Sequence, residues 1–193
     1  MRSARPARSS AYRDGMPPWL VVIDMQRIFA DAMSPWAAPR FSEALAGVQR
    51  LLPAFSGRTI LTRYVAPLEP TGAWLPYFEQ WPFALVPQED PLYDLVPELQ
   101  GLDVRIETRE RFGKWDDGLA AAIGGSRDIV LAGVATDCCV LATALAAGDA
   151  GLRVRVAADA CAGASDDDHA RALAAMSLFA PLVEITWVDA LVQ

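Results

Sequence analysis

The chain has 193 residues, of which 53% are hydrophobic and 21% charged, and its formal net charge is −7. This composition predicts a folded domain with a substantial core and argues against disorder. The negative charge gives no electrostatic reason to expect nucleic acid or an anionic membrane as a partner. No apolar stretch approaches the roughly 20 residues that span a bilayer.

The first residues carry arginine and serine but lack the apolar segment of a secretory signal. We therefore expect a flexible N-terminal arm over residues 1–17, followed by a single domain over residues 18–193. The three cysteines are an odd number, which suits a reducing compartment better than a disulfide scaffold. This cysteine usage predicts a cytoplasmic protein.

Short β-rich runs alternate with helical patterns along the chain. The predicted strands are 19–24, 58–63, 102–107, 127–133, 152–159 and 182–188. The predicted helices are 40–52, 114–123, 139–151 and 166–179. Such alternation predicts right-handed βαβ units, hence an α/β fold with a mostly parallel sheet covered by helices on both faces.

Residues 64–101 interrupt this alternation and hold seven of the fourteen prolines. The segment is too long for an ordinary connection and too aromatic for a disordered linker. We expect an ordered excursion with a short helix near 72–81, which supplies pocket walls or a subunit contact.

The first strand ends on a carboxylate. Val21, Val22 and Ile23 form the uninterrupted β-branched run of a strand covered on both faces, and Asp24 follows at once. Because ligands bind beyond the carboxyl ends of parallel strands, Asp24 is a candidate acid and base. Its other interpretation is a helix cap.

The turn "AGVATDCCV", residues 132–140, joins an apolar strand to an alanine-rich helix. Gly133 permits a sharp turn, and Cys139 is predicted to begin the helix. Free N–H groups and the helix dipole lower the pKa of a thiol there and supply an oxyanion hole. A cysteine in an apolar helix is also commonly a core residue.

Three segments occur in order: "VVIDMQRIF", "LAGVATDCCVLATALAAGDAGLRVRVAADACAG" and "DDDHARAL". With them, the sequence resembles the isochorismatase-like cysteine hydrolase superfamily over about residues 18 to 190. That group includes nicotinamidases, N-carbamoylsarcosine amidases, ureidoacrylate amidohydrolases and isochorismatases. The resemblance implies a Rossmann-like three-layer α/β/α architecture with a six-stranded sheet, a catalytic aspartate, lysine and cysteine, and assembly as dimers or tetramers.

Carried over by position, the resemblance makes Asp24 the acid and base and Cys139 the nucleophile. It also implies a cis peptide between Val134 and Ala135, which directs the Ala135 N–H, beside that of Cys139, toward the substrate carbonyl oxygen. Cys138 occupies a variable position and is expected to point elsewhere.

The catalytic cation is ambiguous. Counting back from Trp115 by the family spacing leads to Arg109, whereas the chain's single lysine, against sixteen arginines, is Lys114. Either cation would lower the pKa of the thiol, but only lysine also exchanges a proton. We favour Lys114 because a chain that otherwise uses arginine has kept lysine there. The other interpretation of Arg109 and of Lys114 is a solvated surface cation.

Nicotinamidases of this superfamily hold a metal with histidines and an aspartate after the second strand, but residues 62–74 here contain no histidine. We therefore predict no metal and no cofactor, and we disfavour nicotinamide as substrate. His169 follows three aspartates that are expected to form a capped, solvated helix start. Cys161 is expected to be a small buried residue.

The predicted substrate-binding residues are Trp36, Arg63, Trp74, Trp81 and Trp115. Tyr77 and Phe83 are further candidates for the pocket wall, and Arg63 would pair with a substrate carboxylate. The favoured hypothesis is a cysteine hydrolase that cleaves a small amide or ureido C–N bond through a thioester acyl-enzyme. The alternatives are vinyl-ether hydrolysis of the isochorismate kind, without the thiol, and a non-catalytic scaffold.

Overall fold

The computed structural model describes residues 16–192, so residues 1–15 of the predicted arm lie outside the described residues. All strand pairs are parallel and form one sheet in the order β3-β2-β1-β4-β5-β6. The strands are β1 (Trp19–Ile23), β2 (Thr59–Tyr64), β3 (Arg105–Arg109), β4 (Asp128–Val134), β5 (Arg153–Ala162) and β6 (Val183–Thr186). The predicted six-stranded α/β fold is confirmed.

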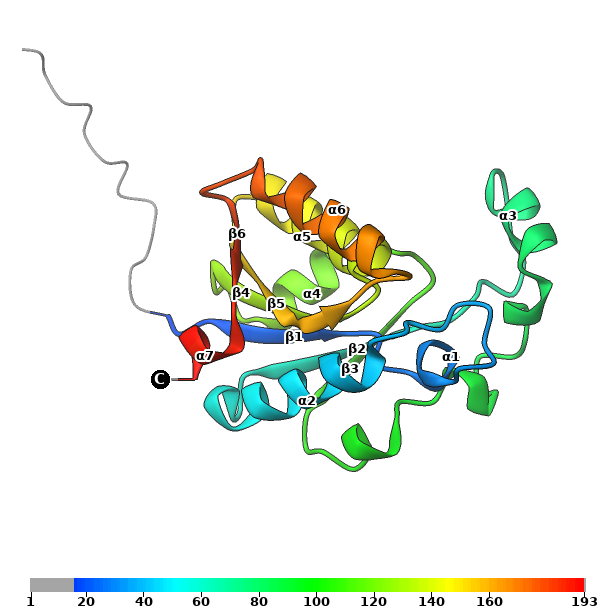
Figure 1. Ribbon diagram of the computed structural model, residues 1–193, viewed down its shortest axis with the longest axis horizontal. Helices are drawn as coiled ribbons and strands as arrows, with labels where there is room; N and C mark the ends of the chain where they lie inside the picture. Colours follow the sequence, from blue (N-terminus) through cyan, green and yellow to red (C-terminus); the bar gives the residue numbers. More distant parts are fainter. Residues whose placement is uncertain (1–15, 193) are drawn as a thin grey trace, which may run out of the picture.

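Helices cover both faces of the sheet, with α4, α5 and α6 on one face and α2 and α7 on the other (Figure 1). The α-helices are α1 (Arg27–Ala30), α2 (Phe41–Leu51), α3 (Trp74–Gln80), α4 (Asp117–Ala122), α5 (Leu141–Asp149), α6 (Asp166–Ser177) and α7 (Val188–Leu191). The 3₁₀ segments are η1 (Leu52–Phe55), η2 (Pro82–Ala84), η3 (Pro91–Tyr93) and η4 (Pro97–Leu99), and η5 (Thr136–Val140) is a π-helical turn.

The central strand β1 is buried on both faces because its side chains alternate between two hydrophobic clusters. Leu20 and Val22 pack on the α2 side, whereas Val21 and Ile23 pack on the side of α4, α5 and α6. The α2 layer lies very close to the sheet: a Cβ on Gly47 would come within 2.7 Å of the Ala160 Cα. A larger residue there would push α2 off β5.

Several predicted boundaries differ from the structure: the helix predicted from residue 114 begins at Asp117, and the strand predicted to end at residue 159 ends at Ala162. Three other differences are instructive. The third strand runs over 105–109 instead of 102–107, because this edge strand is largely exposed and carries no apolar run to mark it. The strand predicted over 182–188 ends at Thr186, and Val188 begins α7. The helix predicted from Cys139 begins earlier, as the π-helical turn η5, so Cys139 lies inside a helical turn and not at its first residue.

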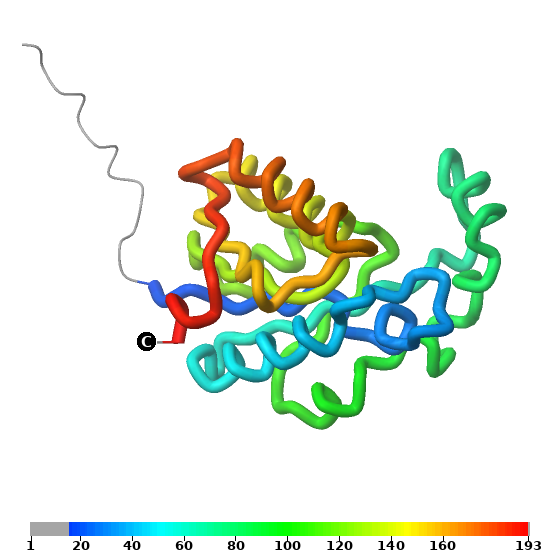
Figure 2. Tube along the Cα trace, viewed as in Figure 1, coloured from blue at the N-terminus to red at the C-terminus, as the bar shows by residue number. Residues whose placement is uncertain are grey.

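The proline-rich excursion is ordered, as predicted, and contains α3 and three 3₁₀ turns. Figures 1 and 2 show α3 at the end of the molecule opposite the start of β1. Gln26 anchors the excursion, because its side-chain amide donates to the carbonyl oxygens of Tyr64 (2.8 Å) and Tyr93 (2.7 Å) and accepts from the Tyr64 N–H (2.7 Å). One buried side chain thus joins the start of this segment and Tyr93 to the chain that follows β1.

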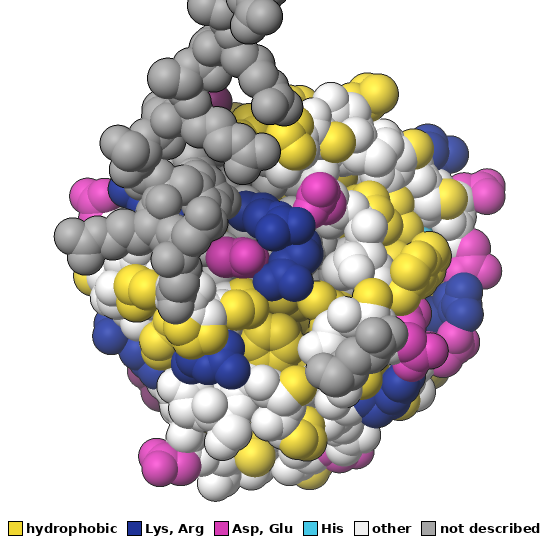
Figure 3. All heavy atoms as spheres, turned by 90° about the vertical axis from the view of Figure 1, so that its left-hand side faces the viewer, with side chains coloured by type: hydrophobic (Ala, Val, Ile, Leu, Met, Phe, Trp, Pro, Cys, Tyr) yellow, Lys and Arg dark blue, Asp and Glu magenta, His cyan; other side chains and the backbone are white. Residues whose placement is uncertain are grey.

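Figure 3 shows the side of the molecule on which β1 begins, where basic and acidic side chains lie beside one another around apolar ones. Ion pairs at the first residues of the strands join Arg155 to Asp128 (2.9 Å) and Arg153 to Glu184 (3.0 Å). Among the described helices, none has the length and hydropathy that crossing a membrane requires.

Candidate active site

Asp24 follows β1 in a left-handed backbone conformation, with φ of 49°, and its side chain is fully buried. Aspartate tolerates this conformation better than most residues. The hydroxyl of Thr62 on β2 fixes the carboxylate: Thr62 Oγ1 accepts from the Asp24 N–H (3.1 Å) and donates to Asp24 Oδ1 (2.6 Å). The second carboxylate oxygen, Oδ2, remains for another partner.

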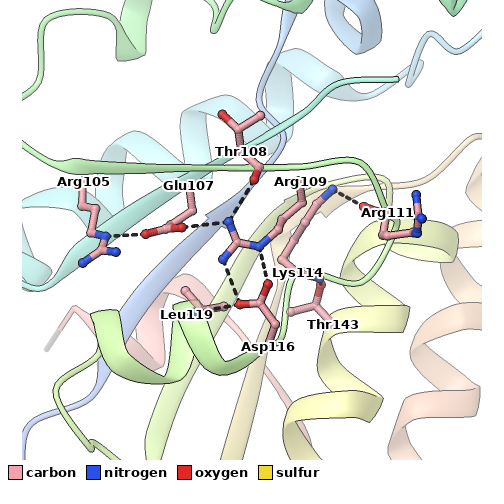
Figure 4. A network of polar contacts seen from close by, with 9 residues as sticks. All are labelled: Arg105, Glu107, Thr108, Arg109, Arg111, Lys114, Asp116, Leu119 and Thr143. Atoms are coloured by element: carbon pink, nitrogen blue, oxygen red, sulfur yellow. Dashed lines mark hydrogen bonds and ion pairs between the residues drawn. The ribbon is translucent and has the colours of Figure 1, made fainter. Parts of the chain in front are cut away.

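That partner is Lys114, whose side chain is 1% exposed and whose Nζ lies 2.8 Å from Asp24 Oδ2. The ammonium also donates to the carbonyl oxygen of Arg111 at 2.7 Å (Figure 4) and lies 5.2 Å from the ring centre of Tyr64. The Lys114 main chain is fixed as well, because its N–H donates to Thr143 Oγ1. A buried charge requires such partners.

Arg109 lies outside this site, which corrects its inclusion as an alternative catalytic cation. Its guanidinium is held between Glu107 (2.8 Å) and Asp116 (2.5 Å), as Figure 4 shows. Asp116 also caps α4 by accepting from the Leu119 N–H. Arg109 therefore ties the edge strand β3 to α4, whereas Lys114 reaches Asp24.

Cys139 is buried, and burial raises the pKa of its thiol well above the ordinary value. The Lys114 ammonium opposes this effect and lowers the pKa, while the Asp24 carboxylate raises it through charge and hydrogen bonding. The expected lowering of the thiol pKa by a helix N-terminus is therefore wrong for the resting protein. Cys139 retains its proton and needs a base, and Asp24 is the carboxylate beside it.

The turn that carries Cys139 follows β4 through a cis peptide between Val134 and Ala135, at the position that the resemblance implied. The Ala135 carbonyl oxygen accepts from the N–H groups of Cys138 and Val140, both at 3.1 Å. Thr143 Oγ1 donates to the Cys139 carbonyl oxygen at 2.6 Å, so one hydroxyl joins the Cys139 turn to the main chain that carries Lys114.

Cys138 differs from its neighbour in exposure and in partners. Its side chain is exposed, and its sulfur lies 3.7 Å from Asp137 Oδ2. Partial desolvation and the Asp137 carboxylate raise the pKa of Cys138 to about 11. Cys138 lines the same cavity as Cys139, and its sulfur contacts Asp137.

Cys139 lies at an apolar cavity of about 430 Å³. The cavity is lined by Phe29, Pro35, Trp36, Ala37, Ala38, Tyr64, Tyr77, Trp81, Phe112, Ala135, Asp137, Cys138, Cys139 and Ala164. Trp36, Trp81 and Tyr77 line it as expected. Sequence reasoning missed Phe29, Tyr64 and Phe112 as pocket residues, although Phe29 ends "VVIDMQRIF" and Phe112 lies two residues before Lys114.

Three predicted substrate-binding residues lie elsewhere. The Arg63 guanidinium donates to the Gln88 carbonyl oxygen (3.3 Å) and does not line the cavity. Trp115 packs against the core on the α4 and α5 side. Trp74 packs behind the wall, with ring centres 5.3 Å from Tyr77 and 5.2 Å from Phe112. Trp74 therefore supports the cavity wall instead of lining it.

A smaller hollow of about 190 Å³, which Cys161 and His169 help to line, has no lining residue in common with this cavity. Cys161 is buried, as expected. Ser165 caps α6 by accepting from the Asp168 N–H (3.0 Å), which confirms the predicted capped start, and His169 Nδ1 lies 2.8 Å from Thr136 Oγ1. Within residues 16–192, no cluster of three or more histidine, cysteine, aspartate or glutamate side chains is arranged to hold a metal ion.

The isochorismatase domain family matches residues 18–186, and the chain belongs to this family of hydrolases. The resemblance found in the sequence is thereby confirmed. A comparison with curated proteins found no match.

Several solved structures share the fold. The cysteine hydrolase from Pseudomonas syringae pv. phaseolicola has 17% identity and a TM-score of 0.80, covering 91% of this chain and 90% of that chain. The pyrazinamidase of Pyrococcus horikoshii in complex with zinc has 24% identity and a TM-score of 0.69, covering 88% and 98%. The N-carbamoylsarcosine amidase from Thermoplasma acidophilum has 18% identity and a TM-score of 0.70, covering 90% and 98%.

The opposing effects of Asp24 and Lys114 on the Cys139 thiol predict shifts of opposite sign. In a background that lacks Cys138 and Cys161, Asp24→Asn should lower the pKa of Cys139, whereas Lys114→Met should raise it. The thiolate absorbance near 240 nm, followed against pH, measures both shifts. Equal titration of the two variants and the background protein would show that neither charge acts on the sulfur.

Lys114 and Arg109 should differ in how their loss affects the protein. Lys114→Met leaves the Asp24 carboxylate buried without its counter-ion, which should cost about 3–5 kcal/mol in the free energy of unfolding. Arg109→Gln removes ion pairs of a partly exposed side chain and should cost about 1 kcal/mol or less. Urea denaturation measures both. A larger loss for Arg109→Gln would contradict the assignment of Lys114 as the buried partner.

Proposed function

We propose that the protein is a cysteine hydrolase that cleaves a small amide or ureido C–N bond through a thioester acyl-enzyme. The observation that carries this proposal is the buried ion pair of Asp24 and Lys114 beside Cys139, at an apolar cavity. Membership of a hydrolase family supports it. The solved structures of similar fold include an N-carbamoylsarcosine amidase and a pyrazinamidase.

In the first half-reaction, Asp24 takes the thiol proton of Cys139, and the sulfur attacks the substrate carbonyl carbon. The nearby Lys114 ammonium stabilises the thiolate. Ala135 and Cys139 both line the cavity, and their N–H groups hold the developing oxyanion. Asp24 then donates the proton to the departing nitrogen, the C–N bond breaks, and a thioester forms on Cys139.

In the second half-reaction, a water molecule attacks the thioester carbonyl carbon, and Asp24 accepts the proton of that water. The C–S bond breaks, the carboxylic acid product leaves, and the proton held by Asp24 returns to the sulfur. Asp24 thus acts as base and then as acid in each half-reaction. One rigid position serves each step because Thr62 and Lys114 bind its two carboxylate oxygens separately.

The vinyl-ether alternative has less support. Isochorismate carries two carboxylates, and the described residues that line the cavity include no lysine or arginine to pair with them. A scaffold would have no need of a buried ion pair, since such a pair adds little stability over well-packed apolar residues. An alkylating reagent reacts with the thiolate, and burial raises the pKa of the Cys139 thiol. Slow alkylation of Cys139 is therefore expected of the enzyme as well and would not by itself favour the scaffold.

The remaining features of the proposal rest on composition and on the resemblance. We propose a small-molecule substrate, no nucleic-acid or membrane partner, a cytoplasmic location and assembly as a homo-oligomer. The net charge of −7 supports the first two exclusions. The three cysteines are free in the structure, which agrees with a reducing compartment.

A screen of small amides and ureido compounds, followed by ammonia release, tests this function. Cys139→Ala should abolish turnover of any true substrate, and Asp24→Asn should lower kcat by about 10²–10⁴-fold. Cys161→Ala, at a cysteine outside the cavity, is the matched control and should keep wild-type turnover. Turnover that survives Cys139→Ala but not Asp24→Asn would instead support a reaction that needs no thiol.

A further inference from the structure

The hydroxyl of Tyr64 is the unusual polar group of the cavity. Tyr64 lines the cavity and is 1% exposed, yet its hydroxyl has no hydrogen-bond partner among the described residues. The neighbouring Tyr93 is also buried, but its hydroxyl donates to the Ala84 carbonyl oxygen and accepts from the Ala66 N–H. Buried polar groups are almost always paired, so an unpaired hydroxyl at a cavity indicates a ligand.

The position of this hydroxyl is fixed by the residues around it. Gln26 binds both the N–H and the carbonyl oxygen of Tyr64. The ring packs edge-on against Trp36 and Tyr93, with ring centres 5.9 and 6.0 Å away, and the Lys114 ammonium lies 5.2 Å from the ring centre. A hydroxyl held so firmly is suited to select the position of a substrate atom.

The hydroxyl also has a defined protonation state. Burial raises the pKa of Tyr64 far above its usual value, and the charge of the Asp24 carboxylate raises it further. Tyr64 therefore stays protonated at neutral pH and can donate a hydrogen bond. Tyr64 and Cys139 line the same cavity.

The other lining residues restrict the charge of a ligand. They are mainly aromatic and aliphatic, and the one charged residue among them is Asp137, whose Oδ1 accepts from the Ala164 N–H (2.9 Å). A substrate carboxylate would lose its water and find no counter-ion in this cavity. A flat, uncharged group would instead gain from contact with Trp36 and Trp81.

We propose that Tyr64 is a specificity-determining residue, which donates a hydrogen bond to one acceptor atom on an otherwise apolar, uncharged acyl group. This inference rests on the proposed function, because that function places the substrate carbonyl at Cys139. The substrate class is therefore an uncharged aryl amide with a single acceptor in its acyl part; this class includes nicotinamide, which the sequence disfavoured only because no metal site was expected. Amides that carry a carboxylate are excluded.

Matched pairs of aryl amides test this assignment. The two acyl groups of a pair differ by one acceptor atom: an ether oxygen replaces a methylene, or a ring nitrogen replaces a CH. Successive pairs place this acceptor at successive positions from the carbonyl. In at least one pair the wild-type protein should favour the acceptor compound about 3–10-fold in kcat/KM, mainly through KM, and Tyr64→Phe should remove this preference. No change of preference in any pair would overturn the proposal.

Stability supplies an independent readout. Tyr64→Phe removes a hydroxyl that has no partner and should leave the thermal midpoint unchanged, whereas Tyr93→Phe removes two hydrogen bonds and should lower it. An equal loss in both variants would show that the Tyr64 hydroxyl is paired within the protein, which would contradict the proposal.

Benzamide and 4-carbamoylbenzoate, which differ by one carboxylate, test the exclusion of charged amides. Equal use of both would overturn the exclusion of carboxylates.

Failure of this inference can be told apart from failure of the proposed function. Binding of the same pairs to Cys139→Ala, followed by tryptophan fluorescence, needs no turnover. A preference for the acceptor compound that disappears in Cys139→Ala/Tyr64→Phe supports the role of Tyr64 even if wild type hydrolyses none of the amides. Turnover without any effect of Tyr64→Phe would retain the hydrolase and reject the specificity residue.

Discussion

The buried ion pair between Asp24 and Lys114 is the interaction on which the account of this site depends. Two charges removed from water carry a large desolvation cost, which their attraction repays only with good geometry and further hydrogen bonds. Thr62 and the Arg111 carbonyl oxygen supply those bonds. The pair acts on Cys139 in both directions, because the ammonium lowers the thiol pKa and the carboxylate raises it. Burial decides the outcome, so the sulfur keeps its proton until Asp24 removes it.

Sheet topology brings these groups together. The last residue of β1, Ile23, pairs with Gly133 of β4, so the chain after β1 and the turn that carries Cys139 emerge side by side. Gly133 has φ of 111°, and a Cβ at this position would lie 2.1 Å from the Ile23 carbonyl oxygen. Only glycine permits that approach. The strand pairing that places Asp24 beside Cys139 therefore depends on the absence of a side chain at Gly133, on the neighbouring strand β4.

The sequence was sufficient for the fold and for the neighbourhood of Asp24 and Cys139, because strand ends and motif order carry that information. It favoured Lys114 over Arg109 on composition alone, since the path of the loop between β3 and α4 depends on the Asp116 cap and on Thr143. It named Arg63 for the pocket and missed Tyr64, because adjacent strand residues face opposite sides and only tertiary structure shows which side borders the cavity. The thiol pKa was misjudged because a helix-dipole argument omits burial.

The most direct test of the central claim is mass spectrometry of the acid-quenched reaction with a hydrolysable amide. The peptide that contains Cys139 should carry an added mass equal to the acyl group, which is hydrolysed on longer incubation and is absent from Cys139→Ala. An acyl group that is found on Cys138 instead, or steady turnover by Cys139→Ala, would contradict the claim that Asp24 and Lys114 serve the sulfur of Cys139.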